Sequence, residues 1–283
     1  MQVRTLGIVG AGQMGTGIAQ VGAQTGLQVR LLDAQASLAE RSFASIQKQL
    51  DSRVAKGKLS AEDRDATLAR ITTGAEHKLL ADCDFVVEAA TENAGLKCAL
   101  FESIDKVLQP HAVLATNTSA LPITKLAAAT QRPDRVIGMH FMNPAPVMRL
   151  VEIIRGLQTS DETVATAREL AIRMGKDVIG ANDMPGFIVN RMLIPFLNEA
   201  CFALQEGLST PEDIDRGAKL GLNHPMGPLE LADLIGLDTV LYMAEVLHRE
   251  FGDDKYRPPT ILRNHVSAGW LGRKTGRGFY KYG

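Results

Sequence analysis

Three residues between positions 116 and 152 have side chains that could carry out proton-transfer chemistry. Ser119 follows a short apolar run, His140 ends another apolar segment, and Glu152 lies inside the apolar run LVEII. A histidine followed by Phe and Asn-Pro places an ionisable ring where a strand ends and a loop begins, a common position for catalytic groups. A carboxylate is costly to bury without a partner. We therefore expect Glu152 to pair with His140 and to fix which ring nitrogen carries the proton.

A glycine-rich turn near the N-terminus could hold the cofactor that such chemistry needs. The run TLGIV at 5–9 is followed by GAGQMGTG, a helix-like stretch and VRLLD at 29–33. Strand, G-x-G-x-x-G turn, helix, strand and terminal acid together form a dinucleotide-binding fingerprint. N–H groups at the helix N-terminus would hold the pyrophosphate, and Asp33 would bind the adenosine ribose and repel a 2′-phosphate, which predicts NAD over NADP. The predicted contacts in the turn are Gly10, Ala11, Gly12, Gln13, Met14 and Gly15.

Strand-like and helix-like segments alternate through the first two thirds of the chain. Apolar strand-like runs recur in DFVVEAA, AVLAT, RVIGMHF and LVEII, and residues 37–70 are typical of a surface pair of helices. The alternation predicts an α/β Rossmann-type doubly wound, mostly parallel sheet with helices on both faces. Ligands of such sheets bind beyond the carboxyl ends of the strands. We therefore expect the glycine-rich turn, Asp33 and residues 90–92, 117–119 and 140–143 along one edge.

The pattern changes at the sequence Asp183-Met-Pro-Gly. From there the chain reads as nearly all helix, and the first of these helices is predicted to begin at Asp183 or Met184. Asn190 falls on the apolar stripe of that helix, where an amide either ties two elements together or faces a ligand. The sequence thus predicts an NAD-binding Rossmann domain at 1–184, with the helical hairpin near 37–70. A smaller all-α domain is predicted at 185–283.

Composition limits the possible partners and compartments. A chain of 283 residues that is 45% apolar and 22% charged can build a real core, and its net charge of -1 gives no reason to expect nucleic acid. The three cysteines form no CxxC pair, so no metal site or disulfide framework is expected and a reducing cytoplasm fits. No secretory signal precedes the first strand-like run, and no apolar run approaches the ~18 residues of a membrane span.

Several longer motifs occur in a fixed order from residue 5 to the end of the chain. They are GAGQMGTGIAQ, ATNTSALPIT, GMHFMNPAPVMRLVEII, DMPGFIVNR, HPMGPLELADLIGLD and GRKTGRGFYKY. Together they resemble the short-chain L-3-hydroxyacyl-CoA dehydrogenases, and most of all the bacterial 3-hydroxybutyryl-CoA dehydrogenases. The resemblance implies a Rossmann domain, a helical domain that carries most of a homodimer interface, and an acyl-CoA substrate.

The resemblance also implies roles for residues at matching positions. His140 would be the general base that takes the proton of the 3-hydroxyl while C3 passes a hydride to NAD, and Glu152 would orient it. Ser119 and Asn190 would bind the substrate, so the site would draw on both domains. The remaining predicted cofactor contacts are Glu92, Lys97, Ser119, Asn143 and Lys274, and the predicted contact with the CoA phosphates is Lys56.

Two alternative functions and the identity of the CoA contacts stay open on the sequence alone. A related dehydrogenase could act on 3-hydroxyadipyl-CoA or on a sugar acid such as L-gulonate, but the catalytic stretch has no clear extra arginine for a second carboxylate. A non-catalytic NAD-binding protein is disfavoured by the presence of all four catalytic candidates. The CoA contacts are open as well, because Gln49 and Ser52 occupy positions where certain relatives carry a serine and a lysine.

Overall fold

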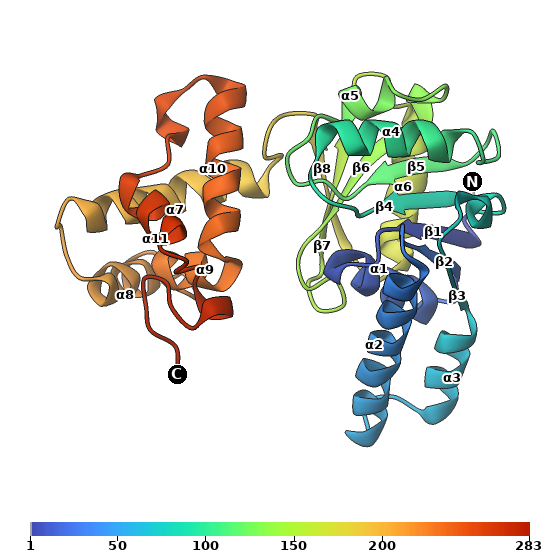
Figure 1. The fold of residues 1–283 in the computed structure, drawn as a ribbon, viewed down its shortest axis with the longest axis horizontal. Helices are drawn as coiled ribbons and strands as arrows, with labels where there is room; N and C mark the ends of the chain where they lie inside the picture. Colours follow the sequence, from blue (N-terminus) through green and yellow to red (C-terminus); the bar gives the residue numbers. More distant parts are fainter. Residues whose placement is uncertain (1) are drawn as a thin grey trace. The chain divides into compact units, whose positions relative to one another are not determined.

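In the computed structural model, which describes residues 2–283, every named strand lies before Pro185 (Figure 1). The chain divides at the Met184–Pro185 bond into an N-terminal unit and a C-terminal unit. Residue 1 of the predicted first domain lies outside the described residues.

The N-terminal unit is built on one sheet, which within residues 2–283 has eight strands in the order β3-β2-β1-β4-β5-β6-β7-β8. Pairing is parallel from β3 through to β6, antiparallel between β6 and β7, and parallel between β7 and β8. This confirms the predicted mostly parallel sheet, although β3 and β8 were not among the predicted strands. The strands are β1 Thr5–Val9, β2 Gln28–Leu32, β3 Ile71–Gly74, β4 Phe85–Glu88, β5 Val113–Thr116, β6 Val136–Phe141, β7 Leu150–Arg155 and β8 Asp177–Asn182.

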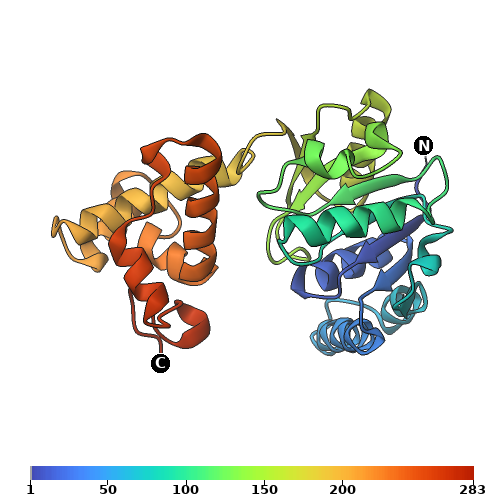
Figure 2. The same cartoon turned by 45° about the horizontal axis from the view of Figure 1, so that its top comes forward.

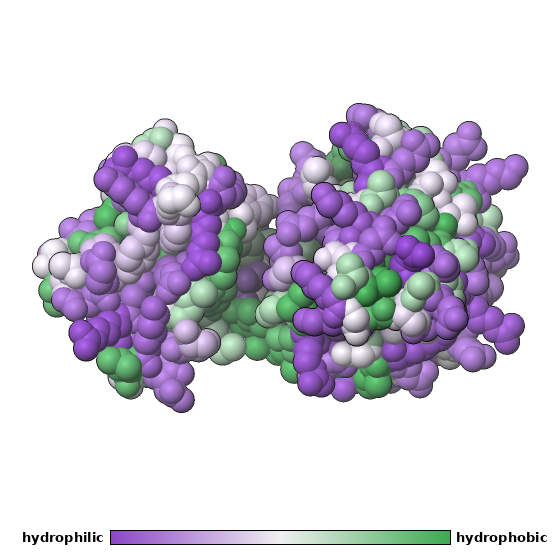
Figure 3. All heavy atoms as spheres, turned by 90° about the horizontal axis from the view of Figure 1, so that it is seen from below, coloured by the Kyte–Doolittle hydropathy of each residue, from purple (hydrophilic) through white to green (hydrophobic). Residues whose placement is uncertain are grey.

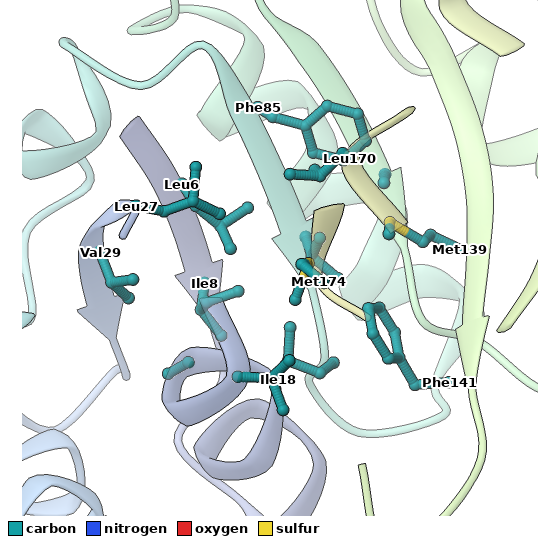
Figure 4. Packing of buried hydrophobic residues seen from close by; sticks show 14 of the residues in the cluster. Leu6, Ile8, Ile18, Leu27, Val29, Phe85, Met139, Phe141, Leu170 and Met174 are labelled. Atoms are coloured by element: carbon teal, nitrogen blue, oxygen red, sulfur yellow. The ribbon is translucent and has the colours of Figure 1, made fainter. Parts of the chain in front are cut away.

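Helices cover both faces of this sheet. Buried residues of α1, α2 and α6 join the inner side chains of the strands in one apolar cluster, in which Leu170 and Met174 of the α6 segment lie near Phe85 and Met139 (Figure 4). On the other face α5 contacts β6 and α4. The helices are α1 Gln13–Gln24, α2 Ala36–Ala55, α3 Ala61–Ala69, α4 Ala94–Asp105, α5 Ile123–Ala127 and α6 Asp161–Arg173, with 3-10 turns at His77–Leu80 and Pro133–Arg135.

The helical pair expected near 37–70 is formed by α2 and α3, which lie side by side in both ribbon views (Figures 1 and 2). The side chain of Ser60 accepts a hydrogen bond from the Asp63 N–H at 3.0 Å and so caps the start of α3. Capping satisfies one of the N–H groups that a helix start leaves without a partner. The same device opens α4 at Asn93 and α6 at Ser160.

Alternation along two strands decides which side chains can form a site. Met139 and Phe141 of β6 point into the apolar cluster, and so do Val151 and Ile153 of β7. Successive side chains of a strand point to opposite faces. The intervening residues, His140 on β6 and Glu152 on β7, therefore share the opposite face.

The C-terminal unit is helical, with a core that includes Ala200, Cys201 and Leu229. Its first helix begins later than predicted, because Gly186 (φ 76°) and Phe187 (φ 50°) lie in the left-handed region and cannot continue a right-handed helix. Polar residues cover much of the surface of each unit, with smaller apolar areas among them (Figure 3). The helices are α7 Val189–Gln205, α8 Pro211–Gly221, α9 Pro228–Ile235, α10 Leu237–Phe251 and α11 Thr260–Ser267, with 3-10 turns at Asp254–Tyr256 and Arg273–Thr275.

Candidate active site

His140 and Glu152 form a direct cross-strand pair. The antiparallel register of β6 and β7 places them opposite each other, and the His140 Nδ1 to Glu152 Oε2 distance is 2.7 Å. Both are buried, with His140 5% and Glu152 0% exposed. Side chains directly opposite on antiparallel strands are close neighbours on one face. A carboxylate at Nδ1 holds the proton on that nitrogen and leaves Nε2 as an acceptor.

Ser119 faces the other nitrogen of the same ring. Its Oγ lies 3.0 Å from His140 Nε2, so the hydroxyl can donate to the nitrogen that Glu152 leaves without a proton. The Ser119 N–H donates to Glu92 Oε1 at 2.7 Å, and the Thr118 hydroxyl donates to the same carboxylate. The structure thus brings Ser119, His140 and Glu152 together as the sequence predicted, and it adds Glu92 as the residue that holds the Ser119 backbone.

Lys97 lies in a buried ion pair that the sequence did not reveal. The lysine is 1% exposed, and its Nζ donates to Glu88 Oε1 at 2.6 Å and to the Ala90 carbonyl at 3.3 Å. Glu88 also accepts from the Thr116 hydroxyl at 2.8 Å. The pair ties α4 to the ends of β4 and β5, and a contact of Lys97 with the cofactor stays a prediction. The signal for Glu88 was available, since it is a carboxylate within the apolar run DFVVEAA.

The glycine-rich turn has the geometry that a pyrophosphate needs. Gly10 has φ 106°, and a Cβ on Gly15 would lie 1.8 Å from the Gly10 carbonyl oxygen, so both positions require glycine. Gly12 is the N-cap residue of α1 and makes no side-chain hydrogen bond to the helix. A Cβ at this position would meet no other atom within 4 Å. The space beside Gly12 is therefore open, no side chain caps the first turn of α1, and the residues present fit an anionic dinucleotide.

Asp33 is fixed at the end of β2 beside this turn. Its Oδ2 accepts a hydrogen bond from the Ala11 N–H at 2.8 Å, and the side chain is half-buried. That bond ties the Asp33 carboxylate to the turn. The second carboxylate oxygen, Oδ1, accepts from the Gln35 N–H at 3.4 Å. A carboxylate in this position can accept from ribose hydroxyls.

A cleft of about 530 Å³ opens beside the turn in the N-terminal unit. Gly12, Gln13 and Thr16 line one wall, residues 144–146 line another, and α2 contributes Arg41 and Gln49. Asn143, a predicted cofactor contact, is exposed just before residues 144–146. Lys56 caps the far end of α2 and is also exposed.

The two remaining predicted site residues belong to the C-terminal unit. Asn190 is half-buried in the first turn of α7. Lys274 forms an ion pair with Asp238, with Nζ 2.6 Å from each carboxylate oxygen. The predicted contacts of Asn190 with the substrate and of Lys274 with the cofactor stay predictions.

Two features that other classes of protein carry are absent from the described residues. Among residues 2–283, no group of three or more His, Cys, Asp and Glu is arranged to hold a metal ion. Over the same part of the chain, no helix is both long enough and apolar enough to cross a membrane.

Each unit matches a model of a known protein family. The model described as "3-hydroxyacyl-CoA dehydrogenase, NAD binding domain" matches residues 5–184. The model described as "3-hydroxyacyl-CoA dehydrogenase, C-terminal domain" matches residues 186–282. The two matches follow the division of the fold and together span nearly the whole chain.

Individual relatives cover the chain from end to end. A probable 3-hydroxybutyryl-CoA dehydrogenase of Bacillus subtilis is 50% identical, with 100% of this chain and 98% of the relative covered. A crystal structure of (S)-3-hydroxybutyryl-CoA dehydrogenase from Ralstonia eutropha is 52% identical, with both chains covered completely and a TM-score of 0.96. A 3-hydroxyadipyl-CoA dehydrogenase of Escherichia coli is 42% identical over 100% of this chain, which spans 60% of that relative.

Proposed function

Because the chain belongs to the 3-hydroxyacyl-CoA dehydrogenase family, we propose that it interconverts (S)-3-hydroxybutyryl-CoA and acetoacetyl-CoA. The protein is an NAD-dependent dehydrogenase with a Rossmann-type domain. The choice of a four-carbon substrate rests on one observation: relatives 50% and 52% identical over the whole chain are named for 3-hydroxybutyryl-CoA.

His140 acts as the general base in this proposal. With Nδ1 held by Glu152, Nε2 is the nitrogen that can take the proton of the substrate 3-hydroxyl, and in the reverse direction it returns that proton to the alkoxide oxygen. Bound NAD supplies the hydride acceptor. Glu152 keeps the ring oriented and balances the imidazolium charge once the proton has moved.

Ser119 positions the reacting oxygen in the same proposal. Its hydroxyl lies 3.0 Å from Nε2, so a substrate oxygen entering beside it can hydrogen-bond to both groups. Asn190 supplies a further hydrogen bond to the substrate from the C-terminal unit. Holding the donor carbon in a reactive orientation lowers the entropic part of the barrier.

The cofactor and CoA contacts follow from the N-terminal unit. The first turn of α1 holds the pyrophosphate and Asp33 holds the adenosine ribose, with Glu92, Lys97, Asn143 and Lys274 as further predicted contacts. Lys56 and the polar residues of α2 along the cleft provide a wall for the phosphates of CoA.

We further propose that the protein forms a homodimer through its C-terminal unit in a reducing cytoplasm. Leu220 and Leu222, at the end of α8, are 75% and 62% exposed, and large exposed apolar side chains can mark a protein contact. All three cysteines are free. Free thiols are typical of proteins from reducing compartments.

The distances from His140 to Ser119 and to Glu152 also suit one other reaction class, hydrolysis. Ser119, His140 and Glu152 are spaced like the serine, histidine and carboxylate of a hydrolase, which would make Ser119 a nucleophile. The nucleotide-binding turn and the family favour the dehydrogenase. A sulfonyl fluoride reagent tests the rival, because a covalent adduct on Ser119 detected by mass spectrometry would support the hydrolase.

The proposed function is tested by acetoacetyl-CoA-dependent oxidation of NADH. Activity should be highest with the four-carbon substrate in a series from four to sixteen carbons, and low with 3-hydroxyadipyl-CoA and L-gulonate in the oxidative direction. Tight NADH binding without turnover of any acyl-CoA would instead indicate a non-catalytic NAD-binding protein. Preference for a substrate with a second carboxylate would indicate the adipyl branch of the family.

A further inference from the structure

The loop at residues 142–149 joins the strand that carries His140 to the strand that carries Glu152. It has no helix or strand of its own, yet Pro144, Ala145 and Pro146 form a wall of the cleft beside the glycine-rich turn. Asn143 precedes this wall. Loops without regular hydrogen bonding need anchors from neighbouring elements if they are to hold one shape.

One anchor is the close approach of α1. A Cβ on Gly17 would lie 2.9 Å from Pro146 Cδ and 3.1 Å from the Ala145 Cβ, so this helix and the loop touch only because position 17 is glycine. Ala145 is 2% exposed and belongs to the apolar cluster of the N-terminal unit. This contact fixes the loop from the side of the nucleotide turn.

The second anchor is Lys176, which comes from the turn between α6 and β8. The turn is a Schellman cap: Gly175 has φ 73°, its N–H bonds to the Ile172 carbonyl, and the Lys176 N–H bonds to the Ala171 carbonyl. This backbone bonding directs the lysine under the loop. Its Nζ donates to the Ala145 carbonyl at 2.5 Å and to the Met148 carbonyl at 2.8 Å.

The burial of Lys176 is costly and has no charged partner to offset it. The residue is 7% exposed, and across residues 2–283 no carboxylate lies within ion-pair distance of its ammonium group. Loss of hydration lowers the pKa of Lys176. Its stabilisation therefore comes from the two loop carbonyls, and an uncharged side chain would fill the space at lower cost.

We propose that Lys176 is a positioning residue that holds loop 142–149 in the shape that binds NAD. The inference rests on the proposed function, because the loop borders the glycine-rich turn and carries Asn143, a predicted contact of bound NAD. His140 and Glu152 are held by strand register and not by the loop. Loss of Lys176 should therefore weaken cofactor binding and leave the chemical step largely intact.

Lys176→Met tests this, with Arg173→Met as the matched control. Arg173 ends α6, three residues before Lys176, and its guanidinium donates to the Val3 carbonyl at 2.6 Å, so the control removes a similar bond away from the loop. Lys176→Met should raise the NADH Kd by about tenfold or more while kcat with acetoacetyl-CoA changes by less than about threefold. Arg173→Met should leave both unchanged, and Lys176→Arg should recover most of the affinity.

Hydrogen–deuterium exchange in the absence of cofactor supplies a readout that does not depend on activity. Exchange in residues 142–149 should increase in Lys176→Met and stay at the wild-type level in Arg173→Met. If the methionine variant does not fold, Lys176→Gln keeps an uncharged donor and carries the same expectation. An unchanged NADH Kd, or an equal loss in Arg173→Met, would overturn the proposal. Wild-type protein that binds no NADH would instead count against the proposed function.

Discussion

Each unit contains buried carboxylates, but the groups that donate hydrogen bonds to them differ between the two units. In the N-terminal unit Glu152 faces the ring of His140 at 2.7 Å. In the C-terminal unit Asp215 and Asp233, which are 2% and 1% exposed, face backbone N–H groups and tyrosine hydroxyls. A histidine can gain and lose a proton near neutral pH, whereas amides and phenols keep theirs. The donors therefore underlie the roles that we propose, proton transfer for Glu152 and a structural role for the two aspartates.

The two aspartates attach the C-terminal segment of the chain to the helices of its unit. Asp215 accepts from the Leu229 and Glu230 N–H groups at 2.8 and 2.9 Å and from the Tyr280 hydroxyl at 2.7 Å. Asp233 accepts from the N–H groups of residues 279 and 280 and from the Tyr282 hydroxyl at 2.9 Å. Asp215 thus joins α8 to the start of α9 and to the end of the chain, and Asp233 joins α9 to the end of the chain. Both carboxylates have a structural role.

Removal of the proposed proton acceptor, His140, should give the largest effect. His140→Ala should lower kcat by a factor of about 10³ or more, because no other group replaces Nε2. The NADH Kd should stay near the wild-type value, since the ring does not hold the cofactor. Steady-state rates and NADH fluorescence titration measure the two quantities. A large loss of NADH binding would show that His140 is part of the cofactor site and would weaken the contrast between the units.

Removal of a structural carboxylate should act on stability and not on the reaction. Asp233→Asn places an amide group among three donors and should cost about 2–4 kcal/mol of unfolding free energy. Denaturant unfolding measures the loss, with Asp238→Asn, an exposed ion-pair partner, as a control that should lose less than about 1 kcal/mol. A fall in kcat of the folded Asp233→Asn protein without a loss of stability would contradict the structural role.

Asp33 tests a third use of a carboxylate, the selection of the cofactor. Asp33→Ala should raise the KM for NADH by about tenfold and narrow the preference over NADPH. Asp33→Asn sharpens the result, because it keeps an acceptor for the ribose and removes the charge that repels a 2′-phosphate. Kinetics with both cofactors give the answer, and unchanged selectivity in both variants would show that Asp33 is not at the ribose.

The smallest effect should be a loss of folding stability at alkaline pH, caused by the buried contacts of Tyr280 and Tyr282. Burial and the hydrogen bond to Asp233 raise the pKa of Tyr282 to about 12, from an ordinary value of 10.0, and the pKa of Tyr280 shifts in the same direction. The folded state then keeps a proton that the unfolded state loses. The stabilisation is present below pH 10 and is lost as the pH rises toward 12. Tyr282→Phe should flatten the dependence of the unfolding free energy on pH between 10 and 12. An unchanged pH dependence would show that Tyr282 is not its source.

Much of the fold follows from local sequence features. The glycine-rich turn with Asp33 and the alternation of strands and helices predicted the sheet, and the change at 183 predicted a helical region after it. Strands β3 and β8 were missed because most side chains of ITTG and DVIGAN are half-buried or exposed, so neither segment forms a continuous apolar run. The start of α7 was placed too early because the positive φ of Phe187 is imposed by its tertiary surroundings, and its type gives no sign of it.

The sequence predicted that His140 and Glu152 would pair, but it did not predict the strand register that brings them together. Polar residues within apolar runs identified His140 and Glu152, but their direct pairing depends on β7 reversing direction after an eight-residue loop. The sequence spacing of the two residues cannot give that register. Glu88 carried the same signal in the run DFVVEAA and was overlooked, whereas Lys176 was missed because the loop that buries it is distant in sequence.

Glu152→Gln tests the central claim, that a buried carboxylate makes His140 a base. The amide has the same shape and fits the same space, but it can donate to Nδ1 and so favour the tautomer in which Nε2 already carries a proton. We predict that kcat for acetoacetyl-CoA reduction and for the reverse oxidation falls by a factor of about 10² or more, while NADH affinity and stability stay close to wild type. A Glu152→Gln enzyme with a kcat within about twofold of wild type would contradict the account.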